Sequence, residues 1–243
     1  MLRKSFIKNE LLPGTWCPGC GIGILLKVFD NIMIEKGLNE KNTVIVSGIG
    51  CAGRIAGYFN IDTVHTLHGR AVAVAEGIKR ANEKLNVVVI SGDGDLLSIG
   101  IGHLLHTLRR EVNLTIFCMN NRVYGMTGGQ ASPTTEKGLR TLTTRQGAEY
   151  LPLDAYNIIK SFHSYFYART TTSHPEHLKE MIKKALDYEK FSFVEIITPC
   201  FTNLGARNQF TNFGEMYQKI RQQYKINSKK GELKKDTLGY DFK

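Results

Sequence analysis

The fold is decided by residues 86–121, which read NVVVISGDGDLLSIGIGHLLHTLRREVNLTIFCMNN. The run 86–91 is apolar and β-branched, as is typical of a buried strand, and 113–119 has the same character. Between them, residues 98–110 carry apolar side chains at a helical spacing. Two buried strands joined by one helix lie parallel, because the helix returns the chain to the end of the sheet from which it started. This stretch therefore predicts a parallel sheet.

The same alternation continues on both sides of this unit. We expect further helices and strands, namely helices over 22–36, 69–82 and 173–188 and strands over 43–47 and 191–198. The helix at 173–188 is predicted to have Ser173 as its N-cap, with Pro175 in the first turn and Glu176 at the third position. The pattern predicts an α/β fold with a doubly wound, mostly parallel sheet and helices on both faces. We assign residues 1–205 to this domain and 206–243 to a basic C-terminal extension.

The composition restricts the class of protein. The chain has 243 residues and a net charge of +10, and no apolar run approaches the roughly 18 residues that a membrane helix needs. Its first residues are charged and polar, unlike the apolar segment of a secretory signal. We therefore expect a cytoplasmic protein that does not enter a membrane.

Much of the positive charge lies near the C-terminus. From Lys219 to Lys243, eight basic residues stand against three acidic ones. A solvated, partly disordered tail is the simplest interpretation, and a docking surface for an acidic partner is the alternative. No interleaving of aromatic and basic residues indicates nucleic-acid binding, so we expect none.

Two polar residues follow neighbouring strands of the predicted sheet. Asp93 comes after the strand at 86–91, and Asn121 comes after the strand at 113–119. The carboxyl ends of parallel strands share one edge of the sheet, where ligands bind in open α/β folds. Carboxylate and amide oxygens suit Mg²⁺, and Gly92 and Gly94 would let the backbone approach a diphosphate. The alternative is two unrelated polar turns.

Four cysteines come from three separate parts of the chain. Cys17 and Cys20 form a Cys-Pro-Gly-Cys turn, Cys51 follows the strand at 43–47, and Cys200 follows the strand at 191–198. In a reducing compartment such thiols are more often metal ligands than disulfides, and four thiolates can hold Zn²⁺ or an iron–sulfur cluster. The fifth cysteine, Cys118, lies in an apolar strand and is expected to be a buried side chain.

These motifs together resemble a known family. Gly92-Asp93-Gly94 with Asn120-Asn121 is similar to the thiamine diphosphate (TPP) and Mg²⁺ motif of TPP-dependent enzymes. Four further segments, at 16–21, 47–51, 65–70 and 120–130, resemble the β subunits of 2-oxoacid:ferredoxin oxidoreductases. The versions HTLHGR at 65–70 and YGMTGGQ at 124–130 are more similar to the 2-oxoglutarate branch, or to a branch of broad specificity, than to the pyruvate branch.

The resemblance implies a set of site residues. It implies that Mg²⁺ is held by Asp93, by the side chain of Asn121 and by the main-chain carbonyl of Val123. It implies a [4Fe–4S] cluster bound by Cys17, Cys20, Cys51 and Cys200. It places TPP against residues of several loops, namely Ile49, Gly50, Cys51, His68, Gly94, Asp95, Gly125 and Met126. Met126 would support the bent form of the cofactor, and His68 would be either a cofactor contact or a structural residue.

The activity implied is the TPP- and coenzyme A-dependent oxidative decarboxylation of a 2-oxo acid, with electrons passed through the cluster to ferredoxin. Arg54, one helical turn beyond Cys51, could pair with a substrate carboxylate or simply face solvent. The glutamate that activates TPP in this family would come from an α subunit, so we expect αβ pairs that dimerise or join a larger assembly. Pyruvate or broad specificity, a non-oxidative TPP decarboxylase or synthase subunit, and a zinc-stabilised basic binding protein remain as alternatives.

Overall fold

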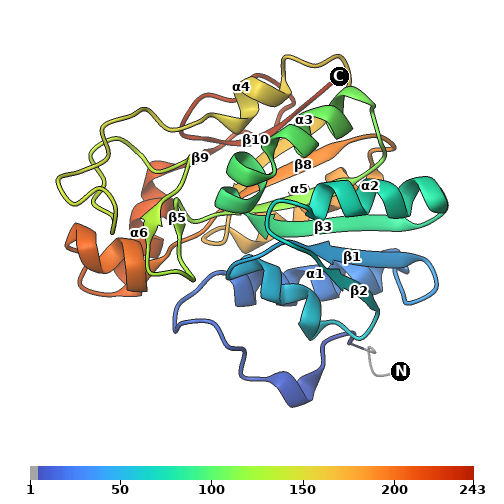
Figure 1. The fold of residues 1–243 in the computed structure, drawn as a ribbon, viewed down its shortest axis with the longest axis horizontal. Coiled ribbons are helices and arrows are strands. Elements are labelled where there is room, and N and C mark those ends of the chain that lie inside the picture. The colour runs from blue at the N-terminus through green and yellow to red at the C-terminus, as the bar shows by residue number, and fades with distance from the viewer. Residues whose placement is uncertain (1–4) are drawn as a thin grey trace.

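The structure is a computed structural model that describes residues 5–243, and it contains one large sheet between two layers of helices (Figure 1). The strand order is β2-β1-β3-β4-β8-β7-β10-β9. The strands are β1 (Thr43–Ser47), β2 (Asp62–His65), β3 (Asn86–Gly92), β4 (Thr115–Asn120), β7 (Phe166–Thr171), β8 (Ser192–Ile197), β9 (Lys225–Ile226) and β10 (Thr237–Phe242). The six strands from β2 to β7 in this order are parallel, and β10 pairs antiparallel with β7.

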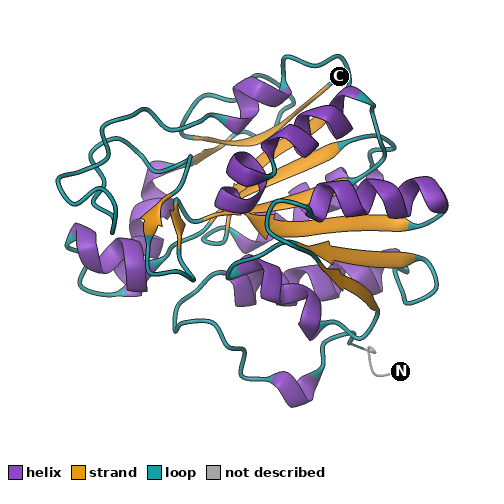
Figure 2. Ribbon diagram, viewed as in Figure 1, coloured by secondary structure: helices purple, strands orange, loops and turns teal. Residues whose placement is uncertain are grey.

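Helices cover both faces of the sheet, as the alternation of buried strand residues requires (Figure 2). On one face, side chains such as Ile45 and Val88 pack with α1 (Ile22–Lys36), α5 (Pro175–Asp187) and the 3₁₀ segment η2 (Ala52–Tyr58). On the other face, Val46 and Val89 pack with the remaining covering helices, α2 (Ala71–Ala81), α3 (Ile101–Arg109) and α4 (Ala155–Ile159). The doubly wound α/β prediction is confirmed.

The chain leaves β1 and β3 in opposite directions. From β1 it passes through η2 to the neighbouring β2, whereas from β3 it passes through α3 to β4 on the other side. Such a reversal of strand order opens a crevice at the carboxyl ends of the two strands. The turns after β1 and β3 border this crevice, and they contain Cys51 and Asp93.

Two helix boundaries differ from the sequence prediction. The expected helix at 98–110 is preceded by a π-helical turn, η3 (Asp95–Ile99), and α3 begins only after Gly100. At α5 the N-cap is His174 and not Ser173. The Ser173 hydroxyl instead donates to the carbonyl of Tyr217, which lies in α6 (Phe213–Gln223).

The C-terminal residues differ most from expectation. They were expected to form a solvated, partly disordered tail, but β10 adds to the edge of the main sheet and Leu238 is fully buried. The hydroxyls of Tyr156 and Tyr165 both donate to Asp241 in β10, at 2.7 and 2.8 Å. An antiparallel strand was missed because 237–242 (TLGYDF) has neither a continuous apolar run nor a clear alternation.

A buried carboxylate joins α2 to α3. Glu76 accepts hydrogen bonds from the Thr107 hydroxyl at 2.6 Å and from Arg110 Nε at 2.7 Å. Burial opposes its ionisation, but these donors and Arg80 outweigh it and lower the pKa of Glu76 to about 2. The helices are thus held by a charged pair as well as by apolar packing. None of the helices in residues 5–243 has the length and apolar character needed to cross a membrane.

Remaining short elements complete the fold. They are η1 (Asn9–Leu11), the hairpin β5 (Val123–Tyr124) and β6 (Gln130–Ala131), the π-helical turn η4 (Phe201–Gly205) and η5 (Ala206–Asn208). The β5–β6 hairpin and η4 lie close to the carboxyl edge of the sheet, where they border the crevice.

Candidate active site

A cavity of about 180 Å³ lies at the carboxyl edge of the sheet. Its walls come from the turns after β1, β3, β4 and β8 and from the loop before α1. All predicted site residues line it, namely Cys17, Cys20, Ile49, Gly50, Cys51, Arg54, His68, Asp93, Gly94, Asp95, Asn121, Val123, Gly125, Met126 and Cys200. The structure therefore brings together residues that are up to 183 positions apart in the chain.

Asp93 and Asn121 meet in this cavity as the topology requires, because β3 and β4 are paired and parallel. Asp93 is almost completely buried, and burial raises the pKa of its carboxyl group although the Thr134 hydroxyl donates to Oδ2 at 2.6 Å. Asn121 Oδ1 accepts the N–H of Val123 at 3.1 Å, which ties the amide to β5. A cation would supply the positive charge that this buried carboxylate lacks, so the residues fit Mg²⁺.

Asp95 is buried and holds three turns together. Its Oδ1 accepts the N–H groups of Gly69 at 2.8 Å and of Ile49 at 3.3 Å, and Oδ2 accepts the Ser91 hydroxyl at 2.8 Å. His68 Nδ1 also lies 2.7 Å from Oδ1, but the ring is not oriented to form a regular hydrogen bond. Asp95 thus fixes the turns after β1 and β2 against β3.

The four cysteines line this cavity together, and Cys20 is close enough to the other three to interact with them electrostatically. Cys51 Sγ and Cys200 Sγ are each 3.6 Å from the point where a Cβ on Gly125 would stand, so they are separated by at most twice that distance. Burial, followed by the neighbouring cysteines, raises the pKa of Cys20 to about 12, and burial also raises the pKa of Cys51 and Cys200. Such thiols are protonated at neutral pH, and metal binding would displace their protons.

The cysteine turns are also joined to each other. The indole N–H of Trp16, next to Cys17, donates to the carbonyl of Cys51 at 2.8 Å, and its ring stacks on Tyr58 at 4.6 Å. Across residues 5–243, no three side chains of His, Cys, Asp or Glu surround one point closely enough to hold a single ion. In a [4Fe–4S] cluster each cysteine binds a different iron atom, so its four thiolates need not surround a single ion. The arrangement of the four cysteines is compatible with a [4Fe–4S] cluster.

Residues 48–196 match a family described as thiamine pyrophosphate enzyme, C-terminal TPP binding domain. The 2-oxoglutarate synthase subunit KorB of Methanothermobacter marburgensis is 42% identical over 96% of this chain and 81% of its own length. This chain belongs to the 2-oxoacid:ferredoxin oxidoreductase β-subunit family. The β subunit of the 2-oxoacid:ferredoxin oxidoreductase of Saccharolobus solfataricus is 42% identical over 77% of this chain and 62% of its own.

A solved structure supports the assignment of this chain to the same family. It is the 2-oxoglutarate:ferredoxin oxidoreductase from Magnetococcus marinus with 2-oxoglutarate, coenzyme A and succinyl-CoA bound. One of its chains matches with a TM-score of 0.81 and 35% identity, over 89% of this chain and 72% of that chain. The family resemblance and the TPP-binding fold are therefore confirmed, which removes the zinc-stabilised binding protein and the non-oxidative TPP subunit as alternatives.

Two predicted residues lie at the rim of the cavity in this β subunit. Arg54 is exposed and lies in η2, one turn beyond Cys51. Met126 follows the β5 strand and is 45% exposed, as single apolar side chains at a protein surface often are. Both side chains are accessible from the cavity, and their roles stay predictions.

Sequence reasoning missed residues that support the site from the loop 121–146 and from η4. Thr134 contacts Asp93, and Asn203 Nδ2 donates to the carbonyl of Gly125 at 2.7 Å. Tyr124 packs so tightly over Gly94 that a Cβ there would stand 2.3 Å from its ring, which explains the need for glycine. The only available signal was the length and low periodicity of the loop, which is typical of functional loops but identifies no single residue.

Proposed function

We propose that this chain is the β subunit of a cytoplasmic 2-oxoglutarate:ferredoxin oxidoreductase and binds TPP, Mg²⁺ and a [4Fe–4S] cluster. The reaction converts 2-oxoglutarate, coenzyme A and two oxidised ferredoxins into succinyl-CoA, CO₂, two reduced ferredoxins and a proton. One observation carries the proposal: the pair Asp93 and Asn121 and all four cysteines of the motif line one cavity. A cytoplasmic location agrees with cysteines that must stay reduced.

The site residues form two groups, one that would hold Mg²⁺ and TPP and one that would hold the cluster. In the first group Asp93, Asn121 and the carbonyl of Val123 would hold Mg²⁺, and Gly94 would let the backbone approach the diphosphate. In the second group the cysteine thiolates would bind the cluster, with Gly125 beside both groups. When bound, TPP supplies the carbanion that attacks the 2-oxo carbon and stores the electrons released with CO₂.

This chain's own contribution is to bind and to orient. Arg54 at the rim would pair with the distal carboxylate of 2-oxoglutarate, which pyruvate lacks. The carboxylate that activates TPP in this family would come from an α subunit, so αβ pairs or a larger assembly are part of the proposal. Pyruvate or a broad range of 2-oxo acids is the second candidate substrate class.

The test begins with anaerobic purification of the complex with its α subunit. We expect a brown protein with about four iron atoms per β chain, and 2-oxoglutarate-dependent reduction of ferredoxin that requires coenzyme A. Asp93→Ala should abolish TPP binding and keep the iron. A colourless preparation containing zinc, or unchanged TPP affinity in the Asp93→Ala variant, would refute these assignments.

A further inference from the structure

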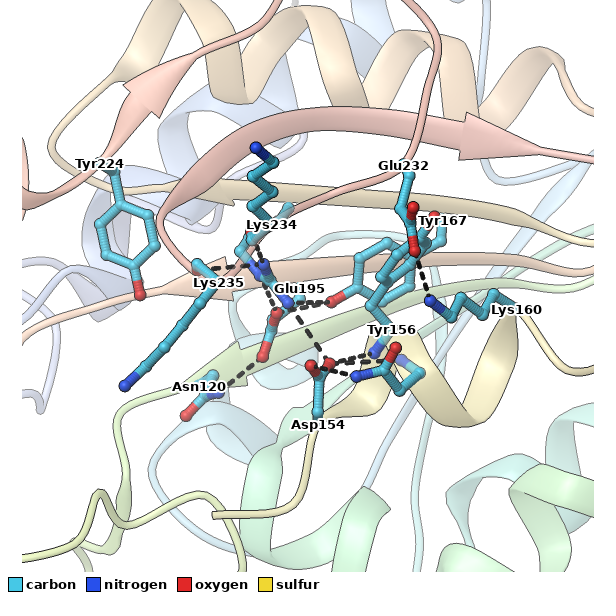
Figure 3. Close-up of polar contacts among 12 residues, drawn as sticks. Asn120, Asp154, Tyr156, Lys160, Tyr167, Glu195, Tyr224, Glu232, Lys234 and Lys235 are labelled. Atoms are coloured by element: carbon cyan, nitrogen blue, oxygen red, sulfur yellow. Dashed lines mark hydrogen bonds and ion pairs between the residues drawn. The ribbon is translucent and has the colours of Figure 1, made fainter. Parts of the chain in front are cut away.

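A chain of buried polar side chains runs from the proposed Mg²⁺ ligand into the sheet. The Thr134 hydroxyl lies 2.6 Å from Asp93 Oδ2 and 2.9 Å from Asn120 Oδ1. Asn120 Nδ2 in turn donates to Glu195 Oε1 at 2.8 Å. Figure 3 shows the inner part of this chain, where Asn120 reaches from the end of β4 to Glu195 on β8. All four side chains are buried.

The inner end of the chain is fixed by charge. Glu195 Oε2 accepts Arg169 Nε at 2.7 Å and the Tyr167 hydroxyl at 2.6 Å. Burial opposes ionisation of Glu195, but Arg169 beside it outweighs burial and lowers its pKa. Arg169 Nη1 also donates to the carbonyls of Lys234 and Lys235, so the C-terminal segment covers this end (Figure 3).

The charged Glu195 determines the orientation of Asn120. A carboxylate only accepts hydrogen bonds, so the amide must turn its NH₂ group toward Glu195 and its Oδ1 toward the cavity side. There Oδ1 faces Thr134 and also accepts the N–H of Arg122 at 3.2 Å. The Thr134 hydroxyl has one proton between two acceptors, and the closer acceptor is Asp93.

Thr134 is held in place by its own loop. The Thr135 hydroxyl donates to the carbonyl of Arg122 at 2.6 Å and accepts the N–H of Ser132 at 2.9 Å. The Ser132 hydroxyl lies a further 3.2 Å from that of Thr134. These bonds fix the short segment 132–135 against the turn after β4 and so hold the backbone of Thr134 in place.

We propose that Thr134 is a positioning residue for Mg²⁺: held by the segment 132–135, it donates its single hydroxyl proton to Oδ2 of Asp93 and so fixes the orientation in which this carboxylate meets the cation. This inference rests on the proposed function, since it assumes that Asp93 binds Mg²⁺ with TPP. A partner that orients a metal ligand commonly affects metal affinity 10- to 100-fold. The residue therefore acts on the Mg²⁺ concentration that the enzyme needs and not on the chemical step.

The experiment uses the anaerobic complex with its cluster intact, after Mg²⁺ and TPP have been removed with a chelator. Calorimetry measures TPP binding across a range of Mg²⁺ concentrations. Thr134→Val, which keeps the shape but loses the hydroxyl, should raise the half-saturating Mg²⁺ about 10- to 100-fold. The turnover number at saturating Mg²⁺ and TPP should stay within about threefold of wild type, and Thr134→Ser should restore the affinity to within the same factor.

A matched control exists in the same chain. Thr107 is also buried and donates to a buried carboxylate, Glu76, at the same distance of 2.6 Å, but away from the cavity. Thr107→Val should lower the stability as Thr134→Val does and leave the half-saturating Mg²⁺ unchanged. An effect on Mg²⁺ confined to Thr134→Val would therefore not be a general result of lost stability.

The outcomes separate this inference from the proposed function. If the wild-type complex binds no TPP, the proposed function is wrong. If wild type binds Mg²⁺ and TPP, Asp93→Ala does not, and Thr134→Val equals wild type, only the positioning role is overturned. If Thr134→Val does not assemble, Thr134→Ala replaces it, and a half-saturating Mg²⁺ that rises less than about threefold, well short of the expected 10- to 100-fold effect, overturns the role.

Discussion

Asp93→Asn is expected to have opposite effects on two stabilities, that of the chain without ligand and that of the chain with Mg²⁺ and TPP bound. In the empty chain, a buried carboxylate with a pKa raised by burial opposes folding, because its charge is removed from water without a cation nearby. The amide variant has the same shape, no charge, and an oxygen that can still accept the Thr134 proton. We therefore expect the empty variant to be as stable as wild type or more stable at neutral pH.

With Mg²⁺ and TPP bound, wild type should be more stable than the Asp93→Asn variant. Mg²⁺ and TPP at 100 times their dissociation constant stabilise a chain that binds them only when folded by about 2.7 kcal/mol. For a chain of this size each kcal/mol moves the unfolding midpoint by about 2–4 °C, which gives an increase of about 5–11 °C for wild type. The variant should show less than about 2 °C, since the charged ligand of the cation is gone.

The assay is thermal unfolding under anaerobic conditions, with and without Mg²⁺ and TPP, followed at a fixed heating rate. The cluster absorbance, recorded in parallel, shows that both proteins carry the same iron. An empty variant several degrees less stable than wild type would show that Asp93 supports the fold and not the ligand. A full ligand-induced increase in the variant would show that Asp93 is not a Mg²⁺ ligand.

Three further results are expected. Cys51→Ser should lose most of the iron, measured with the visible absorbance, while Cys118→Ala keeps about four iron atoms per chain because Cys118 is buried in β4 away from the cavity. Arg54→Ala should lower kcat/KM for 2-oxoglutarate roughly tenfold to hundredfold and affect pyruvate little, as loss of one charge-assisted hydrogen bond predicts; equal losses on both substrates would contradict the carboxylate contact. The pKa of Glu76 is about 2 in the folded chain against 4.5 for an unperturbed glutamate, so the stabilisation from its ionised form is complete above pH 4.5 and is lost as the pH falls toward 2. Urea unfolding should show that about 3 kcal/mol disappears across this range, and that Glu76→Gln does not show this change.

The sequence was informative about the centre of the sheet and less so about its edges. The strands β1, β3, β4 and β8 are buried on both faces, and such strands read as continuous apolar runs. β7 is equally buried but reads FYARTT, because its polar side chains are paired inside the protein, as Arg169 is with Glu195. The edge strand β2 has only half-buried and exposed residues, so its pattern gave no signal.

The site was predictable to the extent that topology alone brings residues together. Asp93 and Asn121 had to meet because they end adjacent parallel strands, and Cys200 joined them because β8 is the next strand in the sheet. Thr134 and Asn203 reach the site from irregular loops, where no period relates a residue's position in the chain to its place in space. Their contacts with Asp93 and Gly125 depend on loop packing, which only the structure shows.

The basic composition of the C-terminal residues has a structural role that a charge count does not reveal. β9 lies at the open edge of the sheet with Lys225 and Ile226 exposed, and charged residues at such an edge hinder pairing with another strand. The ammonium of Lys230 lies over the ring of Phe242 at 3.8 Å, so its charge also contributes to packing against β10. The same segment supplies the Lys234 and Lys235 carbonyls that bind Arg169. The backbone of this segment therefore supports the buried pair behind the active site, whereas its lysine charges remain at the surface, where an acidic partner could meet them.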